Sequence, residues 1–260
     1  MGSFLEKSFK KFLFFRIHIY LLFYSLMLST LKDNFDHISA GFWVLSAFFT
    51  SLLFFFHFYN YISVSLPRRE TLLKIVSIIP IIISLTFLQL RLKLLLLFSF
   101  VYILAVMYNS PFFKKKIQSI IFLKNIMISL LWSLPIGFVP ALLKEGHWDF
   151  AAKNFIITFL YFFSVEIIWD VRDLLADRQR GVKTLPNLLG LKKTKVSLYA
   201  ILSCIIALVF LLDMQIQFLI GLIPLSLFIH FLNEKRGEIF YHSIYLTWLL
   251  LQIITLALDI

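Results

Sequence analysis

The sequence has few acidic residues and a single cysteine. Only 14 of its 260 residues are Asp or Glu, against 25 Lys and Arg, and the one cysteine, Cys204, lies in an apolar stretch. A lone cysteine excludes an internal disulfide and a multi-thiolate metal site, and its ordinary role is buried packing. Low-complexity linkers are also missing, so we expect one domain that spans residues 1–260.

Long apolar runs make up most of the chain instead. Sixty per cent of the residues are hydrophobic and 31 are Phe, which is too apolar for the surface of a water-soluble domain. Nine stretches approach the roughly 17–25 residues that a helix needs to cross the hydrocarbon of a bilayer. They run over residues 12–31, 40–62, 72–90, 93–109, 119–143, 150–169, 195–213, 215–232 and 239–258. The sequence therefore predicts an all-α, polytopic membrane protein with nine transmembrane helices.

Basic residues are distributed unevenly between the connecting segments. Seventeen lie in the N-terminus and in alternate loops, whereas the opposite loops hold only Lys32, Arg91, Lys93 and Lys144. Because short loops rich in Lys and Arg stay on the cytoplasmic side, we expect a cytoplasmic N-terminus in a cell inner membrane. The net charge of +11 follows from this bias and from attraction to anionic membrane lipid, so no nucleic-acid partner is expected.

Four carboxylates cluster where one apolar stretch ends. Glu166, Asp170, Asp173 and Asp177 are spaced three or four residues apart, so on a helix they share an arc of about 60°. Like charges on neighbouring turns repel, and ionised groups at membrane depth are costly. A metal ion, a bound basic group or protonation must therefore offset the charge of these carboxylates.

The longest polar segment of the chain, residues 170–194, begins within this cluster. A long polar segment in a chain with short connections is usually functional, and we expect it to form a cytoplasmic cap. It also carries Arg172, Arg178 and Arg180. These arginines leave an alternative open, in which the acidic residues form a structural salt-bridge network.

The acidic cluster and the segment after it resemble a known family motif. The residues concerned are Glu166–Arg178, Gly181–Pro186 and Gly190, with weaker matches at Tyr108–Pro111 and Lys124–Asn125. The stretch from Glu166 to Gly190 is similar to the second aspartate-rich motif of the UbiA-type intramembrane prenyltransferases, and the weaker matches resemble other positions of that family. The pattern looks most similar to the branch that includes chlorophyll synthases and geranylgeranylglyceryl phosphate geranylgeranyltransferases.

This resemblance implies nine helices around a central cavity, in which an isoprenyl diphosphate lies beneath a cytoplasmic cap. Members of the family use Mg²⁺ to bind the diphosphate and help it leave, after which a lipophilic acceptor attacks the allylic cation. By this resemblance Asp173 and Asp177 are the catalytic, metal-binding pair, and the deeper Glu166 and Asp170 support them. Contacts to the diphosphate are expected from Asn60, Arg68, Lys114, Arg178 and Lys183.

The first aspartate-rich motif of that family is altered in this sequence. Asn60 is present, but Val64 and Arg68 stand where the family has two aspartates. Either Arg68 and Arg69 supply positive charge in place of one ion, or this part of the site no longer binds diphosphate. We expect a Mg²⁺-dependent transferase of isoprenoid lipid or quinone biosynthesis. The alternatives are a catalytically degenerate relative that binds a polyprenyl lipid or partners another membrane enzyme, and a terpene-cyclase-like member.

Overall fold

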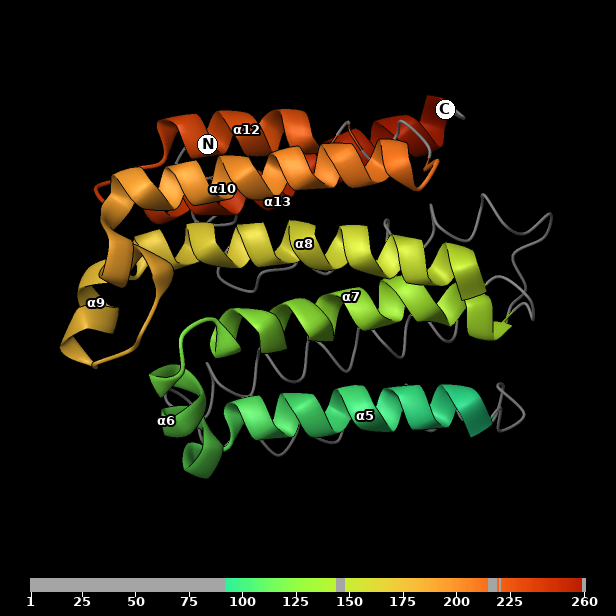
Figure 1. Ribbon diagram of the computed structural model, residues 1–260, viewed down its shortest axis with the longest axis horizontal. Helices are drawn as coiled ribbons and strands as arrows, with labels where there is room; N and C mark the ends of the chain where they lie inside the picture. Colours follow the sequence, from blue (N-terminus) through green and yellow to red (C-terminus); the bar gives the residue numbers. More distant parts are fainter. Residues whose placement is uncertain (1–91, 144–147, 215–218, 220, 259–260) are drawn as a thin grey trace, which may run out of the picture. The chain divides into compact units, whose positions relative to one another are not determined.

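The computed structural model describes residues 92–143, 148–214, 219 and 221–258 (Figure 1). Every regular element among these residues is a helix, and the predicted all-α fold is confirmed for them. The helices are α5 (Leu92–Asn109), α6 (Pro111–Ser119), α7 (Leu123–Leu143), α8 (Trp148–Arg172), α9 (Leu174–Gln179), α10 (Leu185–Leu211), α12 (Leu222–Phe231) and α13 (Glu238–Leu258). The first three predicted spans lie outside the described residues, so the count of nine stays a prediction.

The chain forms two compact units, Met1–Ala105 and Val106–Ile260. The described part of the first unit is the portion of α5 that ends at Ala105. The second unit contains the helices from α6 to α13 and every predicted site residue that lies among the described residues. The expectation of a single domain over residues 1–260 stays a prediction.

Helix α8 is the centre of the second unit. It packs along α7 as an antiparallel neighbour and also contacts α10 and α13 (Figure 1). The two helices approach closely because Gly137 has no side chain where α7 meets the backbone of Phe155 on α8. Trp132 stacks on Phe162 at 5.8 Å between ring centroids, and both side chains are buried. Burial of these side chains holds α7 and α8 together as one layer.

Two helices of the described chain are long and apolar enough to cross a membrane. These are α8, with 25 residues, and α10, with 27. Most of α8 is buried by its neighbours, whereas α10 exposes apolar side chains such as Val196, Phe210 and Leu211. An exposed apolar face of this kind suits a helix that borders lipid.

The segment 170–194 is mostly helical rather than a long loop. The backbone hydrogen bonds of α8 continue past its end, since Asp173 N donates to Trp169 O at 3.2 Å and Asp177 N donates to Asp173 O at 2.8 Å. After α9 the chain turns at Gly181, whose φ of 68° suits glycine, and α10 is kinked at Gly190, whose φ is 73°. The N–H of Lys183 donates to Gln118 O at 3.0 Å, which joins the turn to the end of α6. Residues 180–184 therefore lie against α6, at the end of the helices where α7 begins and α8 ends (Figure 1).

Candidate active site

Asp170 is the most deeply buried carboxylate of the acidic cluster. Lys124 Nζ lies 2.5 Å from Asp170 Oδ1, and Asn125 Nδ2 donates to Oδ2 at 2.8 Å. Both partners come from the first turn of α7, which lies beside the last turn of α8 because the two helices are antiparallel. Both oxygens of a fully buried carboxylate are thus satisfied.

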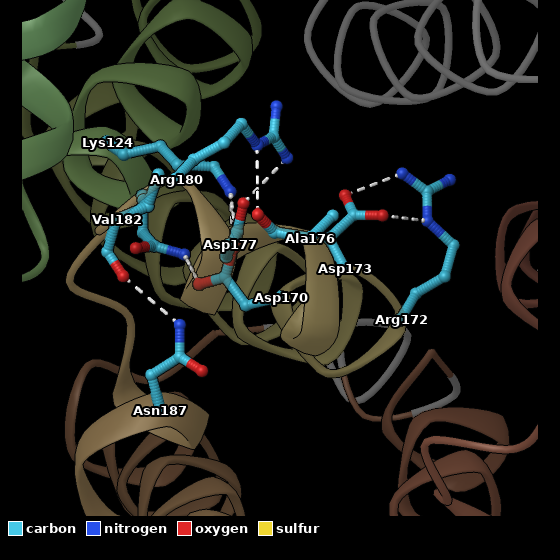
Figure 2. Close-up of polar contacts among 10 residues, drawn as sticks. Lys124, Asp170, Arg172, Asp173, Ala176, Asp177, Arg180, Val182 and Asn187 are labelled. Carbon is cyan, nitrogen blue, oxygen red and sulfur yellow. Dashed lines mark hydrogen bonds and ion pairs between the residues drawn. The ribbon is translucent and has the colours of Figure 1, made fainter.

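Asp177 is held between two basic side chains. Arg180 donates to its Oδ1 at 2.9 Å, and Lys124 Nζ lies 3.7 Å from Oδ2 (Figure 2). Oδ2 is buried and accepts no hydrogen bond from the described residues. Burial raises the pKa of Asp177 above its ordinary value, and the charges of Lys124 and Arg180 oppose that rise. The carboxylate therefore has one oxygen available for a further cation.

Asp173 faces a different set of neighbours. Arg172 binds its carboxylate with two hydrogen bonds, of 2.8 Å from Nε and 2.7 Å from the terminal nitrogen, and Figure 2 shows this pair pointing away from Asp170 and Asp177. The Arg172 guanidinium also lies 4.1 Å from the centroid of the Trp169 ring, which contacts His242 of α13. Asp170 and Asp177 share Lys124, whereas Asp173 is paired separately.

The other predicted site residues lie on α6, α8, α9 or the turn after α9, or fall outside the described residues. Arg178 on α9 and Lys183 in the turn are exposed, and within the described chain their side chains make no hydrogen bond or ion pair. Glu166 is half-buried one turn before Asp170. Lys114 lies on α6. Asn60 and Arg68 fall outside the described residues, so their predicted roles are untested.

Three residues that bind the buried carboxylates are not among the predicted site residues: Lys124, Asn125 and Arg180. Lys124 had a detectable signal, because a lone ammonium at the start of an apolar stretch needs an acidic partner. The Arg180 pair was foreseen only in the salt-bridge alternative. Two further polar atoms, Thr184 Oγ1 and Asn187 Oδ1, are buried with no hydrogen-bond partner among the described residues. Thr184 lies at the N-cap of α10, and Asn187 lies in the first turn of that helix, where its Nδ2 donates to Val182 O at 3.1 Å.

The residues present fit a Mg²⁺ ion that is shared with a phosphate ligand. In the part of the chain that the structure describes, no three His, Cys, Asp or Glu side chains are close enough to hold a metal by themselves. Mg²⁺ usually needs only one or two protein carboxylates when substrate phosphates and water complete its shell. The Oδ2 of Asp177, which accepts no hydrogen bond from the described residues, supplies one such oxygen. A site with one or two carboxylates is therefore compatible with this geometry.

Comparisons with known proteins agree with the motif and the helical architecture. A structure of a UbiA homolog from Aeropyrum pernix K1, without ligand, is similar over 93% of this chain and 98% of its own, with a TM-score of 0.67 and 14% identity. A digeranylgeranylglyceryl phosphate synthase structure is similar over 94% and 98%, with a TM-score of 0.57 and 16% identity. At these identities the two structures establish the fold alone. No curated protein matches the sequence.

The profile of the UbiA prenyltransferase family matches residues 62–236, which include the acidic cluster and the turn that follows it. This match spans more than half of the 260 residues. The chain therefore belongs to the UbiA prenyltransferase family, whose members are integral membrane proteins.

Proposed function

We propose that this protein transfers an isoprenyl group from an isoprenyl diphosphate to a lipophilic acceptor and that the reaction depends on Mg²⁺. The observation that carries the proposal is the buried group formed by Asp170, Asp177 and Lys124 in a chain of this family. Carboxylate oxygens bind a hard divalent ion, and basic side chains beside them bind phosphate oxygens. Both kinds of group meet where α7 begins and α8 ends.

By the family resemblance, Asp177 and Asp173 are the residues that would hold the ion. Asp177 has an oxygen that accepts no hydrogen bond from the described residues, whereas Asp173 would have to leave Arg172 to join it. When bound, Mg²⁺ would neutralise charge on the diphosphate as it leaves. A magnesium–diphosphate unit still carries net negative charge, and the exposed Arg178 and Lys183 are available to contact it. Lys124 pairs with Asp170 and holds it in place, and the same ammonium faces Asp177.

A row of phenylalanine rings supports an isoprenyl chain as the apolar half of the substrate. Phe155, Phe159 and Phe163 are spaced four residues apart on α8, and adjacent rings in this row are 6.0 Å apart between centroids. All three are half-buried, and helical periodicity places them on the face that carries Glu166 and Asp170 further along. We propose that the tail lies along these rings, with the diphosphate at the acidic end.

The finer assignments belong to the same proposal. The sequence pattern favours the branch of chlorophyll synthases and geranylgeranylglyceryl phosphate geranylgeranyltransferases, and a place in isoprenoid lipid or quinone biosynthesis. The excess of basic residues on alternate loops favours an inner membrane, with the N-terminus and the segment 170–194 facing the cytoplasm.

One observation favours a second function, that of a non-catalytic polyprenyl-lipid binder or partner subunit. Asp170, Asp173 and Asp177 each already pair with a basic side chain of this protein. Such pairs satisfy the carboxylates without any metal, as a structural network would. The residues Val64 and Arg68 also favour this second function, because they replace one set of metal-binding carboxylates of the family.

Release of pyrophosphate separates the two functions. The purified full-length protein is incubated with Mg²⁺ and a panel of allylic diphosphates, with and without aromatic and glycerol-phosphate acceptors. If the protein is a transferase, it releases pyrophosphate in a Mg²⁺-dependent manner, and Asp177→Asn abolishes this release. If no donor is cleaved while an isoprenyl diphosphate still binds, the protein is a binder rather than a transferase.

A further inference from the structure

A groove of about 340 Å³ lies between α12 and α13, lined by residues outside the acidic cluster. Its volume falls at the lower end of the range of roughly 300–1,000 Å³ that is usual for small-molecule sites. Its apolar walls are formed by Pro224, Leu227, Phe228, Phe231 and Phe240. Such walls suit a flexible hydrocarbon chain rather than a polar metabolite.

The two polar lining residues mark opposite ends of the groove. Arg236 lies in the connection between α12 and α13, and Thr247 lies nine residues into α13. At the rise of an α-helix this separation along α13 is about 14 Å. The groove therefore runs from a charged mouth at the helix ends into the apolar part of the helix pair.

Arg236 at the mouth has unused hydrogen-bonding capacity. Its Nε donates to Phe231 O at 3.4 Å, and its guanidinium lies 5.5 Å from the Phe240 ring centroid. Within the described residues its terminal nitrogens make no hydrogen bond, and it forms no ion pair, although Glu234 is two residues away. A planar guanidinium in this state is suited to a phosphate.

Further positive charge surrounds the same helix ends. Lys195 reaches from α10 to donate to His230 O at 2.8 Å, and Lys235 is exposed beside Arg236. Lys195 and Arg236 each donate one hydrogen bond to a carbonyl at the end of α12, and this capping is a structural role for both side chains. It does not account for the apolar groove beneath the guanidinium.

We propose that this groove binds one anionic glycerophospholipid, with an acyl chain along the phenylalanine walls and the headgroup phosphate at Arg236. The charge at the mouth selects an anionic headgroup, and the open side of α12, where Ile223 is 65% and Leu227 is 55% exposed, lets an acyl chain enter from the bilayer. The site is separate from the prenyl-transfer chemistry proposed above and does not depend on it.

Native mass spectrometry of the full-length protein in detergent tests the headgroup part of this proposal. Phosphatidylglycerol and phosphatidylcholine with identical acyl chains are titrated separately, and retained lipid is counted. We expect phosphatidylglycerol to be retained more tightly, and Arg236→Gln to weaken its retention by about fivefold, the usual effect of one basic residue at a membrane surface. Arg236→Lys should preserve most of the preference. Lys193→Gln, at an exposed lysine of α10 outside the groove, is the matched control and should change nothing.

A second pair of variants tests the acyl part. Thr247→Phe fills the inner end of the groove and should reduce retention of both lipids, whereas Leu250→Phe, on the exposed side of α13 outside the groove, should not. Equal retention of the two lipids by the wild type overturns the proposal. So does unchanged phosphatidylglycerol retention in folded Arg236→Gln, or equal loss in Thr247→Phe and Leu250→Phe.

Discussion

Lys124 and Asp170 form an ion pair that joins the first turn of α7 to the last turn of α8, with Nζ 2.5 Å from Oδ1. The Asp170 side chain has no exposure to solvent, and that of Lys124 is only 16% exposed. A buried carboxylate without a partner is strongly unfavourable, so this pair fixes the relative position of the two helix ends. The same ammonium faces Asp177, and it thereby couples helix packing to the candidate cation site.

Removing the ammonium of Lys124 alone should destabilise the protein more than removing the charges of Lys124 and Asp170 together. Lys124→Met leaves the Asp170 charge buried and is expected to cost about 3–5 kcal/mol. The double variant Lys124→Met with Asp170→Asn removes that charge and should recover most of the loss. Thermal unfolding of the detergent-solubilised variants measures both effects. Additive losses in the double variant would show that the two groups do not interact.

The acidic residues on either side of the α8–α9 junction should differ in their effect on binding. Asp173→Asn and Asp177→Asn are each expected to weaken Mg²⁺-dependent binding of an isoprenyl diphosphate analogue at least tenfold, about 1.4 kcal/mol. The effect of Asp177→Asn should be larger, because its Oδ2 lacks a hydrogen-bond partner whereas Asp173 is held by Arg172. Asp170→Asn should weaken binding less than either. Calorimetric titration measures these affinities, and unchanged values in folded Asp173 and Asp177 variants would refute the assignment.

The altered first motif gives a prediction about direct phosphate binding. If the guanidinium of Arg68 replaces a metal ion, Arg68→Ala should abolish binding of the diphosphate analogue, whereas its neighbour Arg69→Ala should change it little. Aspartates introduced together at positions 64 and 68 should add a second Mg²⁺ dependence. Equilibrium binding at varied Mg²⁺ concentration measures both results. Normal binding by Arg68→Ala would exclude the compensating role.

Close contact between α7 and α8 should make Gly137 intolerant of any side chain. A Cβ atom there would lie 2.6 Å from Phe155 Cβ and 2.9 Å from its Cα, so one helix must move. Gly137→Ala is therefore expected to destabilise the protein by about 1–3 kcal/mol. Gly237→Ala is the matched control, since nothing lies within 4 Å of the added atom. Equal melting temperatures for the two variants would contradict this packing.

The helical fold was predictable because hydrophobic run length is a local property of the sequence. Long apolar runs predicted the extents of α7, α8 and α13 to within a few residues. The segment 170–194 was harder, since its polar composition suggested a loop where most residues are helical. There the helix of Leu174–Gln179 is set by its junction with α8 and by contacts to α10. Tertiary contacts of this kind are not visible in composition.

The partners of each carboxylate could not be read from spacing. Periodicity placed four acidic side chains on one arc, but it cannot say which basic group reaches each one. Arg172, adjacent in sequence, binds Asp173 and lies over the Trp169 ring, whereas Lys124, 46 residues before Asp170, is brought near by antiparallel packing. Helix geometry therefore predicted that Asp170 and Asp177 lie close together. It was wrong for Asp173, which points away from them with Arg172 (Figure 2) because α8 ends at Arg172.

The buried carboxyl of Asp177 should make stability and Mg²⁺ binding depend on pH in opposite directions. Its pKa is raised, chiefly by burial, so the protonated form is favoured by folding. That contribution is fully present below the ordinary pKa of Asp and is lost as pH rises through the raised value. Without Mg²⁺, Asp177→Asn should thus be more stable than the wild type at neutral pH, and the difference should shrink on acidification.

Added Mg²⁺ should have the reverse effect, because the ion binds the ionised carboxylate. It should stabilise the wild type at neutral pH, and this stabilisation should fade as pH falls through the raised pKa, where protons compete with the ion. Melting temperatures of the wild type and Asp177→Asn, measured with and without Mg²⁺ from neutral to mildly acidic pH, give both slopes. A Mg²⁺ effect of equal size in the two proteins would place the ion elsewhere, since only the wild type has an ionisable group at position 177.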